Sequence, residues 1–220
     1  MSSEAPASGL WTGQAGQPTR LLLLRHGQTV MSAQRRYSGR GDPELTKLGR
    51  AQVDAVAKGI RGIEGCDSVV AALCSPLRRA RQTAEPVAHA LDVPIQLHDS
   101  LVETDFGDWE GLTFAEARAR DPALHQRWLG DDTVPAPGGE SFADVGLRVG
   151  KLLDELVIGY PGQTVLLVSH VTPIKVVLRL ALDTGPSLLF RLHLDLASLS
   201  IAEFYPDGGA SVRGVNLRFS

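Results

Sequence analysis

The chain has 220 residues, 43% of them hydrophobic, and a formal net charge of −3 at neutral pH. This length and composition predict one globular domain with a sizeable core. The charge balance does not favour a nucleic acid or a membrane as partner, so an anion site must arise from a local cluster of basic residues. No apolar run reaches the ~18 residues that a membrane span needs. Cys66 and Cys74 follow neither a metal-ligand spacing nor a disulfide framework, which favours a cytoplasmic protein.

Residues 1–20 differ in composition from the rest of the chain. They are rich in Ala, Gly, Ser and Pro, as flexible linkers are, and they lack the charged start and apolar centre of a secretory signal. We therefore expect a linker or tail over residues 1–20 and a single domain over residues 21–220.

The first half of this domain alternates between strand-like and helix-like stretches. The short apolar run "LLLLRH" at 21–26 predicts a strand that is covered on both faces. Apolar residues at helical spacing predict a helix over 45–60, with Thr46 as its N-cap. A second strand is expected over 67–75, followed by a helix over 76–91.

The second half continues this alternation. The pattern predicts helices over 113–121, 141–158 and 172–182, a strand over 163–170, and two strands around an Asp-Gly turn within 197–219. The helix at 141–158 begins with a capping box formed by Ser141 and Asp144. Such alternation predicts an α/β fold of three layers, α/β/α, around a mostly parallel central sheet.

Basic side chains follow three of the expected strands. They are Arg25 and His26 after the first strand, Arg78, Arg79 and Arg81 after the second, and His170 after the third. The carboxyl ends of parallel strands meet at one edge of a sheet, so two imidazoles and at least two guanidiniums are expected to share one crevice. The helices that begin there also direct free backbone N–H groups toward it. The sequence therefore predicts a pocket for a phosphoryl group.

The chemistry of phosphoryl transfer suits these residue types. The guanidiniums of Arg25 and Arg79 offer paired donors that match phosphoryl oxygens. A neutral imidazole attacks phosphorus directly, and two neighbouring cations lower the pKa of His26 and so favour its neutral form. Gly27 is expected to let the backbone approach the phosphate.

The departing alcohol needs a proton donor. The stretch "LVETDFGDWEGL" places Glu103 after an expected strand and near Asp105, Asp108 and Glu110. Repulsion within such a cluster favours the protonated form of one carboxyl, as a general acid requires. Glu103 is the first candidate and Asp105 the second.

The motifs "LLRHGQT", "YSGRGDPELTKLG", "SPLRRARQTAE", "LVETDFGDWEGL", "PGGESF" and "VSHVTPIK" resemble those of the histidine phosphatase superfamily. This family includes phosphoglycerate mutases, acid phosphatases and α-ribazole phosphatases. The resemblance implies a phosphoglycerate mutase-like fold and a phosphohistidine formed on His26. It also implies that Arg25, Arg79 and His170 hold the phosphate, that Glu103 is the proton donor, and that the enzyme uses no metal or other cofactor.

The same motifs imply further contacts with a small phosphomonoester substrate. Gln28 and Thr29 follow Gly27 in the first motif, and Ser38 and Gly39 open the second. Six residues after the nucleophile, the family often has an asparagine that contacts phosphate, whereas this chain has Ser32. A hydroxyl is a possible substitute for that asparagine.

A closer likeness is to the phosphatase domain of actinobacterial proteins that fuse a ribonuclease H domain to an acid phosphatase. The stretches "ETDFGDWEGLTFAEA" and "RLHLDLASLSIAEFY" carry it. The likeness implies activity of the α-ribazole-5′-phosphate phosphatase type, in cobalamin biosynthesis, and a possible ribonuclease H domain upstream. Residues 1–20 would then be the end of an interdomain linker, and we expect no nuclease activity from this chain.

Three functions stay open at this point. A phosphomonoester hydrolase is favoured over a phosphoglycerate mutase, because a mutase needs cations near Glu103 and the neighbouring sequence is acidic. The third function is a non-catalytic module that binds phosphate.

Some residues outside the motifs are also undecided. Arg35, Arg36 and Arg40 either line the entrance to the pocket or are surface charges, and residues 128–141 either cover the substrate or form a solvent loop. The remaining histidines are taken as structural.

Overall fold

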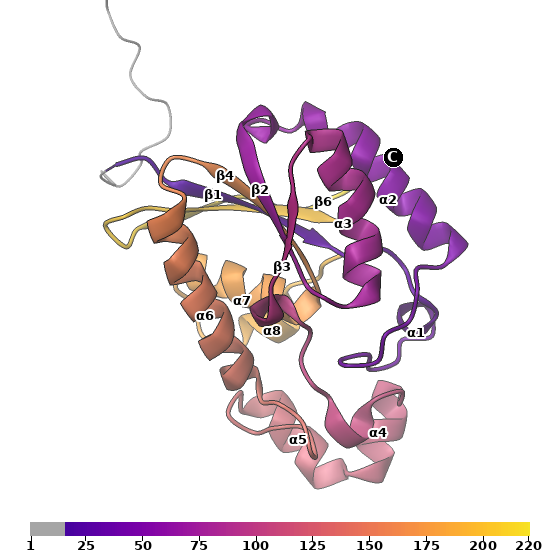
Figure 1. Ribbon diagram of the computed structural model, residues 1–220. Coiled ribbons are helices and arrows are strands. Elements are labelled where there is room, and N and C mark those ends of the chain that lie inside the picture. Colours follow the sequence, from indigo (N-terminus) through magenta and orange to yellow (C-terminus); the bar gives the residue numbers. More distant parts are fainter. Residues whose placement is uncertain (1–15) are drawn as a thin grey trace, which may run out of the picture.

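The computed structural model describes residues 16–220, which form a six-stranded sheet covered by helices on both faces (Figure 1). The strands are β1 (Thr19–Arg25), β2 (Val69–Cys74), β3 (Ile95–Leu97), β4 (Thr164–Ser169), β5 (Leu199–Phe204) and β6 (Ala210–Leu217), in the order β3-β2-β4-β1-β5-β6. The strands β1, β2, β3 and β4 are parallel, whereas β5 pairs antiparallel with both β1 and β6. The expected three-layer α/β fold is confirmed.

The four leucines of β1 explain why this strand lies at the centre of the sheet. Leu21 and Leu23 face one core with α6 (Phe142–Gly159) and α7 (Val171–Ala181). Leu22 and Leu24 face the other core with α2 (Lys47–Gly59) and α3 (Arg78–Leu91). Each leucine is at most 1% exposed. Successive side chains of a strand point to opposite faces, so an unbroken apolar run is what a strand with helices on both sides requires.

The local signals at helix ends are mostly confirmed. Thr46 accepts a hydrogen bond from Gly49 N at the start of α2, and Ser141 and Asp144 form the expected capping box of α6. The helix α3 begins at Arg78 rather than at residue 76, because Leu77 is the extended N-cap. The strand β1 begins at Thr19, two residues before the expected domain boundary, and residues 1–15 of the expected linker lie outside the described residues.

Two further helices extend beyond the carboxyl edge of the sheet. These are α4 (Phe114–Arg120), which was expected, and α5 (Pro122–Gly130), which was not (Figure 1). The short helices α1 (Val30–Ala33) and α8 (Leu188–Arg191) complete the described helices of four residues or more. A strand was expected directly before Glu103, and this is wrong. A 3₁₀ turn at Asp99–Leu101 separates Glu103 from the preceding strand, β3.

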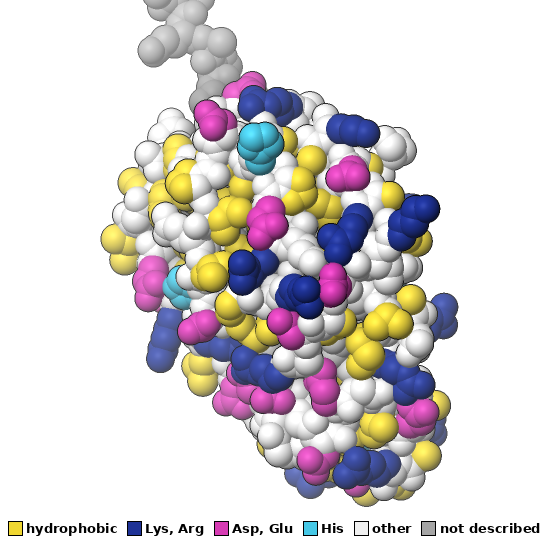
Figure 2. Space-filling view, turned by 45° about the vertical axis from the view of Figure 1, so that its right-hand side comes forward, with side chains coloured by type: hydrophobic (Ala, Val, Ile, Leu, Met, Phe, Trp, Pro, Cys, Tyr) yellow, Lys and Arg dark blue, Asp and Glu magenta, His cyan; other side chains and the backbone are white. Residues whose placement is uncertain are grey.

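The surface carries both signs of charge. Figure 2 shows basic and acidic side chains interspersed over the face that it presents. None of the helices within residues 16–220 is long and apolar enough to cross a membrane. The expectation that this chain binds no nucleic acid stays a prediction.

Candidate active site

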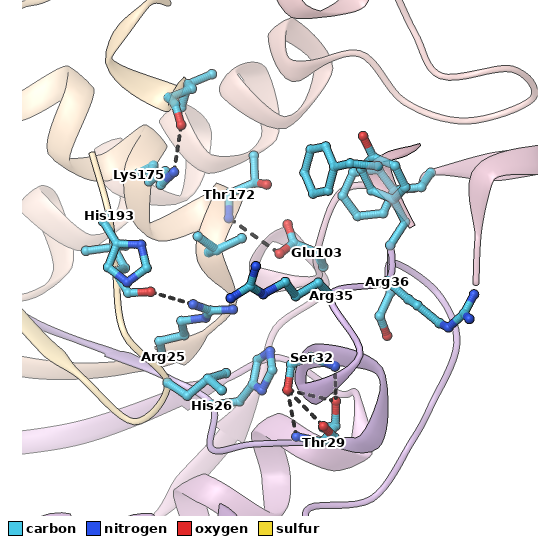
Figure 3. Close-up of a pocket in the computed structure, with 18 of the residues that line it drawn as sticks. Arg25, His26, Thr29, Ser32, Arg35, Arg36, Glu103, Thr172, Lys175 and His193 are labelled. Atoms are coloured by element: carbon cyan, nitrogen blue, oxygen red, sulfur yellow. Dashed lines mark hydrogen bonds between the residues drawn. The ribbon is translucent and has the colours of Figure 1, made fainter. Parts of the chain in front are cut away.

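A pocket of about 670 Å³ lies beside the carboxyl end of β1 and the first turns of α7. Arg25, His26 and Glu103 line it, together with Thr172 and Lys175 from α7 (Figure 3). This volume is typical of a site for a small molecule. The structure thus brings Arg25 and His26 together with Glu103, whereas Arg79 and His170, which were expected in the same crevice, lie next to His26 but do not line the pocket.

The imidazole of His26 has one committed nitrogen and one free nitrogen. Its Nδ1 lies 2.8 Å from the carbonyl oxygen of Gly27, and a carbonyl only accepts, so Nδ1 carries the proton. The neutral ring then has its lone pair on Nε2. Burial, followed by the charges of Arg79 and Arg25, holds the pKa of His26 well below its usual range. This combination gives a neutral nucleophile with a defined reactive atom.

His170 lies against His26, with ring centroids 5.1 Å apart, but both of its nitrogens have partners. Its Nδ1 accepts a hydrogen bond from Arg79 Nε at 3.2 Å, and its Nε2 lies 2.8 Å from Ser75 Oγ. The side chain is fully buried. Of the two imidazoles, His26 is therefore the one equipped to attack. A phosphate contact by His170 stays a prediction and requires Nε2 to exchange Ser75 for a phosphoryl oxygen.

The guanidinium of Arg79 is engaged chiefly with the protein itself. Besides His170, it donates to the carbonyl oxygens of Ser38, Gly39 and Gly41 at 2.7–3.0 Å. Four of its five N–H donors are used in this way. Arg79 thus fixes the 38–41 loop and the tautomer of His170, and one N–H remains for the predicted phosphate contact.

Arg25 has more donors available. One terminal nitrogen donates to the carbonyl oxygen of Leu194 at 2.5 Å, while Nε is buried and has no hydrogen-bond partner within residues 16–220. A buried guanidinium donor without a partner is costly unless a ligand satisfies it. Arg25 is therefore well suited to hold an anion beside His26.

Glu103 lies across the pocket from His26 (Figure 3). Its side chain is buried, its Oε1 accepts from Thr104 N at 2.8 Å, and its Oε2 lies 3.4 Å from Thr172 N at the start of α7. A phosphoryl group beside Arg25 would then lie between the nucleophile and this carboxyl. The arrangement suits attack from one side and proton donation from the other.

The expected cluster of carboxylates around Glu103 is wrong. Asp105 pairs with Arg40, Asp108 lies 3.9 Å from Arg120, and Glu110 accepts from the backbone N–H groups of Gly39 and Gly41. None of the three acids lines the pocket. The acidity of this segment therefore says nothing against an anionic substrate.

Gly27 and Gln28 have structural roles that differ from those expected. The N–H of Gly27 donates to Thr83 Oγ1, and a Cβ at this position would lie 2.7 Å from the carbonyl oxygen of Gly49. The glycine is thus required for close approach of α2, and a phosphate contact by its backbone stays a prediction. Gln28 is absent from the pocket lining, and its N–H donates to Gln52 Oε1.

The other small polar residues divide into two groups. Thr29 and Ser32 line the pocket, but they also cap α1: Ser32 N donates to Thr29 Oγ1, and Ser32 Oγ donates to the carbonyl oxygen of Thr29. Ser38 lines the pocket as well, and its Oγ is buried without a partner within residues 16–220. The backbone of Gly39 is held by Glu110 and Arg79.

Two features of the pocket were not expected from the sequence, namely its aromatic wall and Lys175. The wall is formed by aromatic side chains from separate segments, so no local sequence pattern predicts it. These side chains are Phe106, Phe114, Trp128, Phe142 and Phe190. Trp128 is 2% exposed and belongs to a packed cluster, which excludes a solvent loop at this position. Lys175 follows Thr172 by one helical turn on α7, and that spacing was the available signal.

The two neutral histidines predict a pH-dependent stability. Burial also lowers the pKa of His170 well below its usual range, and the charge of Arg79 adds to this shift. Below pH 6.5 these two histidines become protonated in the unfolded chain but stay neutral in the folded chain. The free energy of unfolding is therefore expected to fall by about 1.4 kcal/mol per pH unit for each histidine, until the pH reaches its folded pKa.

Urea titrations between pH 7.5 and pH 5 measure this slope. The variant with both His26→Asn and His170→Asn is the reference and should show a shallower slope. Equal slopes for the two proteins would contradict the assignment of two neutral histidines.

The comparisons with known proteins agree with this geometry. Residues 21–217 match the model of the histidine phosphatase superfamily (branch 1). Bifunctional protein Rv2228c of Mycobacterium tuberculosis is 60% identical over 216 residues, which are 98% of this chain and 58% of that protein. This chain thus spans little more than half of that relative.

Solved structures share the fold as well. Mycobacterial glucosyl-3-phosphoglycerate phosphatase Rv2419c is 29% identical with a TM-score of 0.80, over 91% of this chain and 100% of that one. A putative α-ribazole-5′-P phosphatase of Escherichia coli is 27% identical with a TM-score of 0.79, over 91% and 97% of the two chains.

Proposed function

The chain belongs to the histidine phosphatase superfamily, and from that premise we propose that it hydrolyses phosphomonoesters through a phosphohistidine formed on His26. The observation that carries the proposal is the free Nε2 of a neutral His26, in a pocket that the side chain of Arg25 also lines. Glu103 lines the same pocket and lies across it from His26 (Figure 3). The proposed hydrolase needs no metal or other cofactor.

The reaction follows from these positions. Nε2 of His26 attacks phosphorus while the bond to the ester oxygen breaks, and the carboxyl of Glu103 gives its proton to the departing alcohol. Water then attacks the phosphohistidine and transfers a proton to the Glu103 carboxylate, which releases phosphate and restores both groups. Arg25 stabilises the charge that spreads over the phosphoryl oxygens.

The aromatic wall indicates the kind of alcohol. Phenyl and indole rings offer broad apolar surfaces that prefer flat, ring-bearing ligands. We therefore propose esters of the α-ribazole 5′-phosphate type, in which a planar base is joined to a sugar phosphate. The likeness to a putative α-ribazole-5′-P phosphatase supports the same class.

A second class of substrate has support from the charges in the pocket. Arg35, Arg36 and Lys175 line it in addition to Arg25, and cations favour an ester that carries a carboxylate or a second phosphate. Phosphoglycerate mutase activity and hydrolysis of glucosyl-3-phosphoglycerate are therefore alternatives, as is a non-catalytic phosphate-binding module. The likeness to a glucosyl-3-phosphoglycerate phosphatase supports the second of these.

Initial rates of phosphate release separate these classes. The purified chain, with a chelator present, is compared on α-ribazole 5′-phosphate, glucosyl-3-phosphoglycerate, 3-phosphoglycerate and glycerol phosphate. The proposal predicts the highest kcat/KM for α-ribazole 5′-phosphate. Phe190→Ala should lower that value about tenfold and leave glycerol phosphate unchanged, because only the ring-bearing ester reaches the wall.

Other outcomes decide against parts of the proposal. A preference for glucosyl-3-phosphoglycerate, or isomerisation of 3-phosphoglycerate without phosphate release, would contradict the proposed substrate. Loss of activity with the chelator would contradict a metal-independent reaction.

We also propose, from the likeness in the sequence, that a ribonuclease H domain precedes this chain in a longer cytoplasmic protein. Cleavage of an RNA–DNA hybrid by this chain alone would contradict the absence of nuclease activity.

A further inference from the structure

Arg35 occupies a backbone position that disfavours an arginine. Its φ is +55°, in the left-handed region. Arg35 N donates to the carbonyl oxygen of Ser32, and Arg36 N donates to that of Met31, which together form a Schellman motif at the end of α1. Glycine is the usual residue at this position, because a Cβ is strained there. The Schellman hydrogen bonds hold this conformation, and what the side chain of Arg35 contacts decides whether it has a function.

The side chain of Arg35 points into the active site. Arg35 lines the pocket, and Figure 3 shows its guanidinium between Arg25 and Glu103. Within residues 16–220 this guanidinium has no hydrogen-bond or ion-pair partner. Arg36 differs, because it donates to the carbonyl oxygen of Gly111 and pairs with Glu116. Only Arg35 of the two therefore has all its donors free for a ligand.

The side chain at position 32 offers no free hydrogen-bond donor to the pocket. The hydroxyl proton of Ser32 goes to the carbonyl oxygen of Thr29, and its oxygen accepts from Thr29 N. Ser32 is thus held in the cap of α1. Arg35 follows it by three residues and extends its guanidinium into the same pocket.

We propose that Arg35 is a substrate-binding residue that donates hydrogen bonds to the phosphoryl oxygens in place of a side chain at position 32. This inference rests on the proposed phosphoryl pocket. Arg25 and Arg35 then hold the group from two sides, and the strained backbone aims the second guanidinium. The sequence left Arg35 undecided between the entrance to the pocket and the surface, and the structure places it in the pocket lining.

The variant Arg35→Gly separates a binding role from a structural one. Glycine relieves the left-handed strain, so the Tm is expected to rise by ~2–4 °C. Without the guanidinium, the Kd for inorganic phosphate, measured by calorimetry, is expected to increase by roughly 10- to 100-fold. The kcat/KM for ester hydrolysis should fall by a similar factor, and Arg35→Lys should restore part of it. Arg61→Ala, which removes an exposed arginine outside the pocket, is the matched control.

Two outcomes keep this inference distinct from the proposed function. If Arg35→Gly binds phosphate within twofold of Arg61→Ala, Arg35 does not hold the phosphoryl group and the inference is overturned. If the wild-type chain hydrolyses no ester but its phosphate affinity depends on Arg35, the proposed function fails and the inference stands.

Discussion

Replacement of His26 by alanine is expected to lower kcat/KM for ester hydrolysis by roughly 10⁴-fold or more, with little change in the fold. The variant lacks the Nε2 lone pair, so water must displace the alcohol directly. Arg25 and Glu103 are still present, but they cannot supply the two-step route. Rates of phosphate release at saturating and limiting substrate measure the loss, and circular dichroism checks the fold.

Two other histidines make this prediction specific. His89→Ala removes an exposed imidazole from α3 and should leave the rate unchanged. His170→Ala should reduce the rate but still allow a phosphorylated enzyme to form, since His26 keeps its nucleophilic nitrogen. Nearly full activity of His26→Ala, or loss of phosphorylation in His170→Ala alone, would reverse the two roles.

Glu103→Gln is expected to lower kcat by roughly 10²–10⁴-fold for esters of aliphatic alcohols. An alkoxide is a poor leaving group without a proton, and glutamine retains the shape of the side chain but cannot donate one. For an aryl phosphate, whose phenolate departs unaided, the first step should be nearly normal. The second step still lacks its base, so a burst of phenol equal to the enzyme concentration is expected in a stopped-flow trace.

Asp105→Asn is the matched control for this prediction, because Asp105 was the second candidate from sequence. Its carboxylate bonds the N–H of Gly107 and lies 3.5 Å from Arg40, and it does not line the pocket. We expect less than a tenfold loss for Asp105→Asn. A larger loss in this variant than in Glu103→Gln, with no phenol burst, would assign the proton transfers to Asp105.

Much of the fold could be predicted because its signals are local. The run of four leucines required a strand with helices on both sides, and Leu21 to Leu24 are buried alternately in two cores. Thr46 and Ser141 cap their helices through hydrogen bonds that span three residues, so spacing alone identified them. The start of α3 was misplaced by two residues, because the extended conformation of Leu77 depends on its surroundings.

The site was predictable only in part, for a physical reason. Arg25 and His26 end the central strand, and strand direction alone places them at the pocket. Phosphate contacts were predicted for both Gly27 and Arg79. In the structure, Gly27 N donates to Thr83, and Arg79 donates chiefly to the 38–41 loop. Such hydrogen bonds depend on how distant loops return to the sheet. The aromatic wall depends on the same tertiary packing, which sequence spacing does not encode, and only the structure could decide which of the candidates Arg35, Arg36 and Arg40 line the pocket.

A phosphate bound covalently to His26 during turnover would be direct evidence for the proposed hydrolysis. The chain is mixed with substrate for milliseconds and quenched in alkaline detergent, because the P–N bond of phosphohistidine survives base but not acid. Peptide mass spectrometry then locates the phosphate. We expect one phosphate, on Nε2 of His26, that disappears after acid treatment and is absent from His26→Ala. Phosphate release without any labelled histidine, or with the label on His170, would contradict it.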